Sequence, residues 1–451
     1  MRASYTLRGL LGLAAALVSS VVLDGHAASA TPGLPPSGRS AGPRDVLPSP
    51  SWGVAPTFEA LEGMVADPGG PKDIALLPMI YRGDLTIRRP LSIHGRKGAV
   101  LEGSGSKTVV TIAASDVLVE DVVVRGSGRR HTAEDAGFRA TGERVRIANA
   151  RVEETLFGVS LLECKRCVVE DVHVLGWGDE AELRGDGIKL WESDDSVVRG
   201  CLVERSRDVV VWYTKRATLD GNEVRASRYG AHFMYAHDGA VRRSRFMNNV
   251  VGVFVMYSAR LEVTGNVVAG ARGAAGMGLG LKDSDGVRVS GNWLVANTTG
   301  TYLDNTPRTA AQPVTFERNR FALNAVALGL HSPGKGLSFH GNDFGQNTAM
   351  VEVDGGGDAL GVEMRGNHYT DYEGYDLDGD GVGDVAYEVK ALSSQLTETR
   401  PALKFFRGTA AMGVIDAVAR AVPVFASRKV LVDPAPLSRE PDFVASQQRA
   451  P

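Results

Sequence analysis

Methionine and histidine side chains occur close together near the middle of the chain. Residues 228–235 read Arg-Tyr-Gly-Ala-His-Phe-Met-Tyr and contain His232 and Met234, and His237 and Met256 follow them. Thioether sulfur and imidazole nitrogen suit copper, and Cu⁺ in particular, better than they suit magnesium or calcium. These four residues are therefore candidate ligands of a transiently bound Cu⁺ ion.

Large aromatic side chains occupy the matching positions of the neighbouring repeats. One position of the aligned repeats is expected to face inward, and it holds Leu190, Val211, Phe233, Val255, Leu281 and Leu330. The residues that follow these are Trp191, Trp212, Met234, Met256, Lys282 and His331, and the next ones are Glu192, Tyr213, Tyr235, Tyr257, Asp283 and Ser332. Exposed aromatic side chains are typical of protein interfaces. Trp191, Trp212, Tyr213, Tyr235 and Tyr257 are therefore candidate partner-binding residues, whether or not this face also binds copper.

A pair of cysteines lies at the equivalent turn one repeat earlier. Cys164 and Cys167 form a C-x-x-C pair in place of Ser193 and Ser196. In an oxidising compartment such a pair is either a local disulfide or a soft-metal site. We expect the disulfide, with Cys201 as a small buried residue, but copper binding by the reduced thiols stays open.

An Asp/Gly-rich segment near the C-terminal end resembles part of a calcium-binding loop. Asp376, Asp378, Asp380 and Asp384 hold the first, third, fifth and ninth places of such a loop, whereas Tyr387 stands where an EF-hand has Glu. Carboxylates this close together repel one another without a cation. The segment is either a shortened Ca²⁺ site or a solvated acidic turn.

A recurring phrase predicts the elements that position these residues. Between Asp121 and Asn367 it returns with a mean step of about 25 residues. Its copies include VLVEDVVVRG, CVVEDVHVLG, ATLDGNEVRA, VRVSGNWLVA and LSFHGNDFGQ. Apolar residues alternate within each copy, and the recurring Asn suits a left-handed turn conformation and side-chain ladders between coils. The chain is therefore expected to be all-β, a right-handed parallel β-helix of about 11–12 coils.

The ends of the chain differ in character from the repeats. Residues 1–30 are expected to be a secretory signal peptide and residues 31–50 a flexible leader. The β-helix with an N-terminal cap is assigned to 51–372, the acidic loop to 373–395, and a helical docking or capping segment to 396–451. A docking role would use Phe405 and Phe406.

Composition limits the class of protein. The formal net charge is -3, and no segment after the signal peptide is apolar enough to span a bilayer. A basic nucleic-acid-binding protein is therefore excluded, and we expect a protein exported to the periplasm.

Several motifs together resemble the NosD family. They are Arg184–Trp191, Arg207–Tyr213, Arg228–Tyr235 and Asn367–Tyr372 running into the acidic loop, within a match from about residue 55 to about residue 435. The resemblance implies a non-enzymatic periplasmic protein that works with an ABC transporter permease, its cytoplasmic ATPase and a copper chaperone lipoprotein. Its implied task is to supply copper for the catalytic copper–sulfur cluster of nitrous oxide reductase.

Two other classes of function stay open. The first is a carbohydrate-active β-helix enzyme, such as a pectinase-like hydrolase, lyase or epimerase, in which Asp186, Glu192 and Asp208 would form the carboxylate cluster. The second is a binding or structural repeat protein, such as a surface adhesin.

Overall fold

The structure is a computed structural model. It describes residues 49, 51–178, 180, 183–333, 335–354, 357–390 and 400–406, isolated positions from 409 to 418, and residues 428–442. The predicted signal peptide and nearly all of the predicted leader lie outside the described residues.

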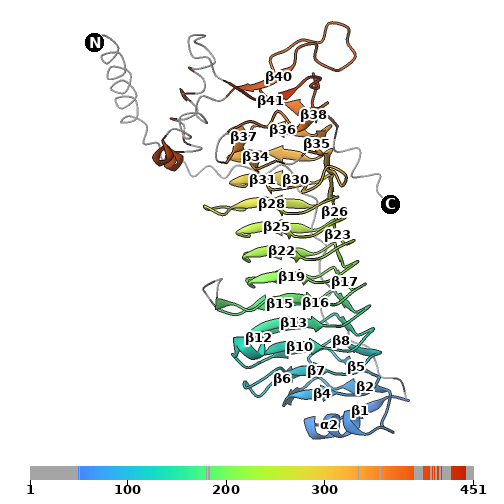
Figure 1. Cartoon of the computed structure of the whole chain (residues 1–451). Helices are drawn as coiled ribbons and strands as arrows, with labels where there is room; N and C mark the ends of the chain where they lie inside the picture. The colour runs from blue at the N-terminus through green and yellow to red at the C-terminus, as the bar shows by residue number, and fades with distance from the viewer. Residues whose placement is uncertain are drawn as a thin grey trace.

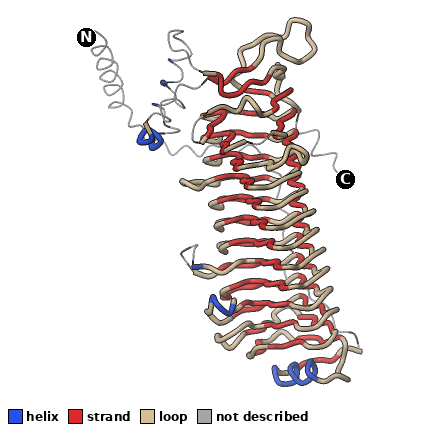
Figure 2. The backbone as a smooth tube through the Cα atoms, viewed as in Figure 1, coloured by secondary structure: helices blue, strands red, loops and turns tan. Residues whose placement is uncertain are grey.

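Three parallel sheets run along the axis of a β-solenoid, whose coils are stacked as Figure 1 shows. We call them sheets A, B and C. Each strand pairs with the equivalent strand of the coils before and after it. Figure 2 shows that strands and turns make up most of the described backbone, with little helix.

Sheet A has 14 strands. In order they are β1 (Gly53–Ala55), β2 (Asp73–Leu76), β5 (Leu91–Gly95), β8 (Val117–Glu120), β11 (Arg146–Ala148), β14 (Val168–Glu170), β17 (Val197–Arg199), β20 (Thr218–Asp220), β23 (Ala240–Arg242), β26 (Glu262–Thr264), β29 (Arg288–Ser290), β32 (Val314–Glu317), β35 (Leu337–His340) and β38 (Glu363–Arg365).

Sheet B has 13 strands. They are β3 (Ile80–Arg82), β6 (Val100–Glu102), β9 (Val123–Arg125), β12 (Arg151–Thr155), β15 (His173–Gly176), β18 (Leu202–Glu204), β21 (Glu223–Arg225), β24 (Arg245–Met247), β27 (Val267–Ala269), β30 (Trp293–Val295), β33 (Arg320–Ala322), β36 (Asp343–Gly345) and β39 (His368–Tyr369).

Sheet C has 12 strands and carries the candidate site. They are β4 (Leu85–Ile87), β7 (Val110–Ile112), β10 (Ala136–Ala140), β13 (Phe157–Leu162), β16 (Ile188–Trp191), β19 (Asp208–Trp212), β22 (Tyr229–Met234), β25 (Val251–Met256), β28 (Met277–Lys282), β31 (Thr299–Asp304), β34 (Val326–His331) and β37 (Ala349–Val353). A short 3-10 helix, η2 (His131–Ala133), precedes β10.

The predicted all-β parallel solenoid is confirmed, but it has about 14 coils rather than 11–12. The copies of the repeated phrase correspond to β8 and the later strands of sheet A. The earlier strands β1, β2 and β5 belong to coils that lack the phrase. Their sequences are not copies of the phrase, so the repeat did not reveal them.

Asparagine ladders join the coils inside the solenoid. The side-chain amide of each ladder residue donates to the next one at 2.9–3.0 Å, through Asn266, Asn292, Asn319, Asn342 and Asn367. The expected ladders are therefore present. The expected left-handed conformation belongs to the residue before the ladder Asn, such as Gly265 and Gly291 with φ of 63° and 64°. Glycine adopts this conformation without steric cost, which leaves the Asn free for the ladder.

Both ends of the solenoid are covered. At the N-terminal end, α2 (Phe58–Ala66) buries Leu61 and Val65, and the Thr57 side chain caps it by accepting a hydrogen bond from the amide of Ala60. At the other end, β40 (Tyr387–Lys390) and β41 (Lys429–Asp433) form an antiparallel pair. These covers keep water away from the open edges of the first and last coils.

Asp433 of β41 closes the main asparagine ladder. Its buried carboxylate accepts hydrogen bonds from the backbone and side-chain amides of Asn367 at 3.2 and 2.9 Å and from the Tyr369 hydroxyl at 3.0 Å. The ring of Tyr387 stacks on Tyr369 with 3.7 Å between the centroids. The sequence did not reveal this strand, which lies within the segment expected to be helical.

Candidate functional site

The outer face of sheet C carries the aromatic and thioether side chains in the expected register. Trp191 pairs with Trp212, Trp212 with Met234, and Met234 with Met256 on consecutive coils. The residues that precede them, expected to point inward, are buried. The column continues through Lys282, Asp304 and His331. Because neighbouring strands lie about 4.8 Å apart, the two methionines are close neighbours.

Three tyrosines form a stack at the turns that follow this column. The rings of Tyr213 and Tyr235 are 5.2 Å apart and nearly parallel, as are those of Tyr235 and Tyr257 at 5.1 Å. Trp191 adds a tilted contact with Tyr213 at 5.0 Å. All three tyrosines have φ near 50°, which bulky residues rarely adopt. Tyr213 and Tyr235 nevertheless stay about 40% exposed, so the stack does not serve to bury them.

His232 lies on β22 close to Met234 but is itself buried. Its ring packs against Trp212, Tyr229 and Phe254 with centroids 5.3, 4.7 and 6.0 Å away. Neither ring nitrogen has a hydrogen-bond partner, and Nδ1 lies 3.8 Å from the Asp208 carboxylate. Burial removes the solvation of the imidazole, and the contact with the Asp208 carboxylate replaces the lost hydrogen bonds only in part. A ligand could supply the missing interaction if the aromatic side chains moved.

His237 lies in the turn after β22, in isolated bridges with Lys215 and Ala259. Its Nδ1 is buried without a hydrogen-bond partner. Burial and the nearby charge of Arg260 lower the pKa of His237, which favours the neutral imidazole that metals bind. The structure thus places the four methionine and histidine candidates for copper binding on two adjacent coils, with His232 the least accessible.

Further apolar residues extend this face, and the repeat pattern alone did not identify them. Tyr229, Phe254, Met277 and Tyr302 belong to β22, β25, β28 and β31. The Phe254 ring lies over Gly280, where a Cβ atom would come within 2.3 Å of it. Simple alternation along each strand would have placed Phe254 outward. The register between β19 and β22 is irregular, so the repeat does not predict which residues lie beside Tyr229.

Two of the three carboxylates proposed for the alternative enzyme site are bound by arginine side chains. Arg207 donates two hydrogen bonds to Asp186 at 2.9 and 3.0 Å, and Arg228 donates two to Asp208 at 2.9 and 2.6 Å. Both aspartates are buried. Burial raises the pKa of Asp186, whereas the pKa of Asp208 is lowered because His232 and Arg228 outweigh the opposite effect of its burial. Glu192 is exposed on the surface and accepts from the Trp191 indole at 3.2 Å.

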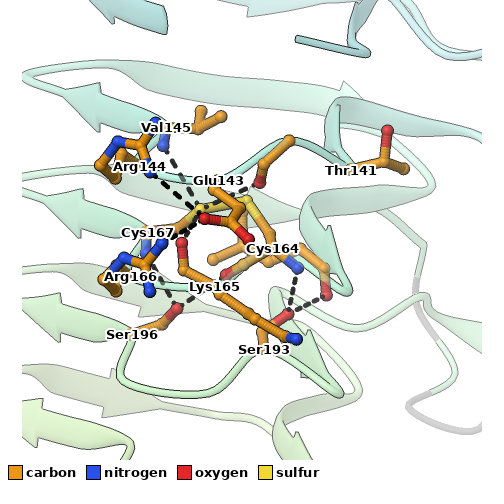
Figure 3. The surroundings of a disulfide bond; sticks show 12 residues. Thr141, Glu143, Arg144, Val145, Cys164, Lys165, Arg166, Cys167, Ser193 and Ser196 are labelled. Carbon is orange, nitrogen blue, oxygen red and sulfur yellow. Dashed lines mark hydrogen bonds and ion pairs between the residues drawn. A yellow bond between two sulfur atoms is a disulfide. The ribbon is translucent and has the colours of Figure 1, made fainter. Parts of the chain in front are cut away.

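Cys164 and Cys167 are joined by a disulfide bond, as the spacing predicted. Figure 3 shows the bond beside Ser193 and Ser196 of the next coil, whose hydroxyls accept from the cysteine amides at 3.1 and 3.0 Å. Both cysteines are buried. Copper binding here would require reduction. Cys201 is free and buried, and burial raises the pKa of its thiol to about 12.

The acidic loop gathers three of its four predicted calcium ligands. Carboxylate oxygens of Asp376, Asp378 and Asp380 lie within 4.8 Å of one another. Asp384 instead accepts a hydrogen bond from the amide of Leu377 at 2.7 Å. Hydrogen bonds from Ser438 and from backbone amides outweigh burial and lower the pKa of Asp376.

The predicted docking segment is described only in part. The 3-10 helix η4 (Pro401–Phe406) contains Phe406, which is 47% exposed, while the side chain of Phe405 lies outside the described residues. Among the residues that the structure describes, no helix is long and apolar enough to cross a membrane.

Known proteins resemble both the sequence and the fold. Residues 172–374 match the family described as periplasmic copper-binding protein (NosD). Proteins named probable ABC transporter binding protein NosD are 28% identical in Stutzerimonas stutzeri, over 80% of this chain and 85% of the relative, and 29% identical in Pseudomonas aeruginosa, over 85% and 92%. The A-module of mannuronan C-5 epimerase AlgE6 from Azotobacter vinelandii matches in fold alone. Its TM-score is 0.53 at 14% identity, over 68% of this chain and 94% of the module.

Proposed function

Because this chain belongs to the NosD family, as its motifs predicted, we propose that it is a periplasmic accessory protein for copper delivery. It works with an ABC transporter permease and its cytoplasmic ATPase, and it receives copper from a chaperone lipoprotein. The copper is destined for the catalytic copper–sulfur cluster of nitrous oxide reductase. The family's description as a copper-binding protein and the relatives' names as transporter binding proteins support this proposal.

The observation that carries the proposal is the pairing of Met234 with Met256 on the outer face of sheet C. Both thioethers are partly exposed, and His232 and His237 lie on the same coil as Met234. Two sulfur donors with imidazole nearby form a donor set that suits Cu⁺. Partial exposure suits an ion that must be received and passed on rather than kept.

The aromatic residues around the methionines would receive a partner protein. Trp191, Trp212, Tyr213, Tyr235 and Tyr257 form one continuous contact surface through their ring contacts. Aromatic and methionine side chains are enriched at protein interfaces. A partner docked here would cover the candidate copper ligands, so that copper could pass directly between the two proteins.

A role as a carbohydrate-active enzyme is less compatible with these contacts. Asp186 and Asp208 are each held by two hydrogen bonds from an arginine and are buried. A general acid or nucleophile must reach its substrate, and neither carboxylate does so here. The likeness to the epimerase module concerns the fold alone. We therefore infer an accessory protein without a catalytic site.

Deletion of the gene tests the proposed function. We expect nitrous oxide reductase purified from the deletion strain to keep its binuclear copper centre but to lack its catalytic copper–sulfur cluster. Complementation with the wild-type gene is the control. A reductase with an intact cluster would contradict the proposal, and release of reducing sugar or unsaturated product from pectin or alginate would favour the enzyme.

The acidic loop is proposed to bind Ca²⁺ through Asp376, Asp378 and Asp380. A cation between these carboxylates would offset their repulsion and stabilise the folded state by binding to it alone. Calcium should therefore raise the melting temperature of the wild-type protein but not that of the double variant Asp378→Asn, Asp380→Asn. Equal melting of the wild type with calcium and with chelator would exclude the site.

A further inference from the structure

The segment Asp371–Val385, between β39 and β40, forms a loop with a fixed shape. We call it the acidic tip, and Figure 1 shows it projecting beyond β40 at the C-terminal end of the solenoid. The Tyr372 hydroxyl donates to the carbonyl of Val385 at 2.6 Å and closes the base of the loop. A Cβ atom at Gly374 or Gly383 would lie 2.1 or 2.0 Å from the Tyr372 side chain. Glycine at both positions therefore leaves room for the Tyr372 side chain.

The C-terminal tail holds the acidic tip from a second side. The amide of Gly383 donates to the carbonyl of Pro436 at 2.7 Å. The backbone amide of Ser438 donates to Gly381 at 3.0 Å, and its hydroxyl donates to Asp376 at 3.1 Å. A loop fixed in this way loses little conformational entropy when it binds a partner.

Large apolar side chains are exposed on this fixed loop. Leu377 is 80% exposed, more than any other large hydrophobic side chain of the described residues, and Tyr375 is 57% exposed. Val385, at the base, is 40% exposed. A single exposed leucine is ordinary, but an aromatic and an aliphatic side chain two positions apart on a fixed loop resemble the anchors of an interface.

The charge of the acidic tip identifies the kind of surface it fits. It contains six Asp or Glu residues and no Lys or Arg. We propose that the acidic tip is a docking element for a protein surface in which an apolar pocket for Tyr375 and Leu377 is surrounded by basic residues. An anionic lipid surface would instead repel these carboxylates. This contact is separate from the aromatic face of sheet C, which lies along the side of the solenoid.

The experiment measures binding of the full-length mature chain to its purified permease–ATPase complex in detergent, and this choice of probe rests on the proposed function. The test variant is Tyr375→Ser with Leu377→Ser. The matched control is Leu360→Ser, which removes another leucine that is 50% exposed. We expect the test variant to bind about tenfold more weakly, as expected for anchor residues of an interface, and the control to bind like the wild type.

A second measurement tests whether the negative charge of the acidic tip contributes to binding. With chelator present, wild-type binding should weaken as NaCl is raised, and Asp378→Asn with Asp380→Asn should reduce this dependence. If the Tyr375→Ser, Leu377→Ser variant has the wild-type melting temperature and unchanged affinity, the docking proposal for the acidic tip is wrong, but the proposed function is not contradicted. Failure of the wild type to bind the complex at all overturns both the tip and the transporter partnership. If the Tyr375→Ser, Leu377→Ser variant loses binding to phosphatidylglycerol vesicles but keeps its binding to the complex, the proposal of a protein partner for the acidic tip is wrong.

Discussion

At the scale of single residues, substitution can distinguish the role of the Met234 and Met256 sulfur atoms in copper binding from the role of these side chains in packing. Leucine has nearly the volume of methionine, and both side chains lie on the outer face, so replacement of both should change stability by less than about 1.5 kcal/mol. The loss of both thioethers should weaken Cu⁺ binding at least about tenfold. Competition with a Cu⁺ chelator measures the affinity.

Met247→Leu is the matched control for these two substitutions. Met247 ends β24 on sheet B, one strand before β25, and it is partly buried in a separate apolar cluster. We expect this variant to bind copper like the wild type. If the Met234→Leu, Met256→Leu variant also keeps its copper affinity, the outer face of sheet C is an interface only.

A histidine at the N-terminal end should make stability depend on pH. Burial lowers the pKa of His94, but hydrogen bonds with Glu120 and Asp73 outweigh this and raise it overall. A folded-state pKa above the unfolded value means that the stabilisation is complete below the unfolded pKa, near 6.5. It is lost as the pH rises through the folded-state pKa.

The variant His94→Gln removes this contribution. The difference in melting temperature between wild type and variant should therefore be larger at pH 6 than at pH 8. A difference for His94→Gln that is independent of pH would mean that its contacts act through packing, such as the stacking on Trp52 at 4.2 Å.

At the scale of elements, the asparagine ladder ends on a single buried carboxylate. Asp433→Ala would leave the amides of Asn367 and the hydroxyl of Tyr369 without their acceptor. Buried donors without partners are costly, so we expect a loss of at least about 2 kcal/mol in the free energy of unfolding. Urea unfolding measures it. Asp433→Asn keeps an acceptor oxygen and should cost less, and equal losses in both variants would argue against the ladder contact.

The sequence could predict the solenoid because each coil repeats the same alternation of buried and exposed residues. The register that brings Met234 beside Met256 follows from this period alone. The contact of Asp433 with Asn367 could not be predicted, because the two residues are 66 positions apart and no repeat links them. Asp433 is one acidic residue among many until β41 places it at the end of the ladder.

The burial of His232 was also beyond the reach of the sequence. Alternation puts this residue on the outer face, as it does Met234, and outer-face residues are usually accessible. The aromatic rings of Trp212, Tyr229 and Phe254 come from three different strands and cover it. Such mutual covering depends on side-chain sizes across coils, and a single strand pattern does not contain that information.

At the scale of the whole molecule, one experiment can distinguish a capping role of the C-terminal segment from a docking role. Residues 391–427 contain η4 and connect β40 to β41, and Lys390 is paired with Lys429 across these strands. The connection therefore leaves and re-enters the solenoid at adjacent positions. A short Gly-Ser turn in its place should leave the cap, including Asp433, unchanged.

We predict that this variant is exported, melts like the wild type and binds copper like the wild type. Its co-purification with the permease should fall well below the wild-type level, and assembly of the catalytic cluster should fall with it, because the exposed Phe406 and the basic residues beside it supply a docking contact in addition to the acidic tip. Truncation before Leu396 is the instructive contrast, since it also removes β41 and should destabilise the last coil. Co-purification of the Gly-Ser variant at the wild-type level would show that the transporter is recognised elsewhere on the solenoid.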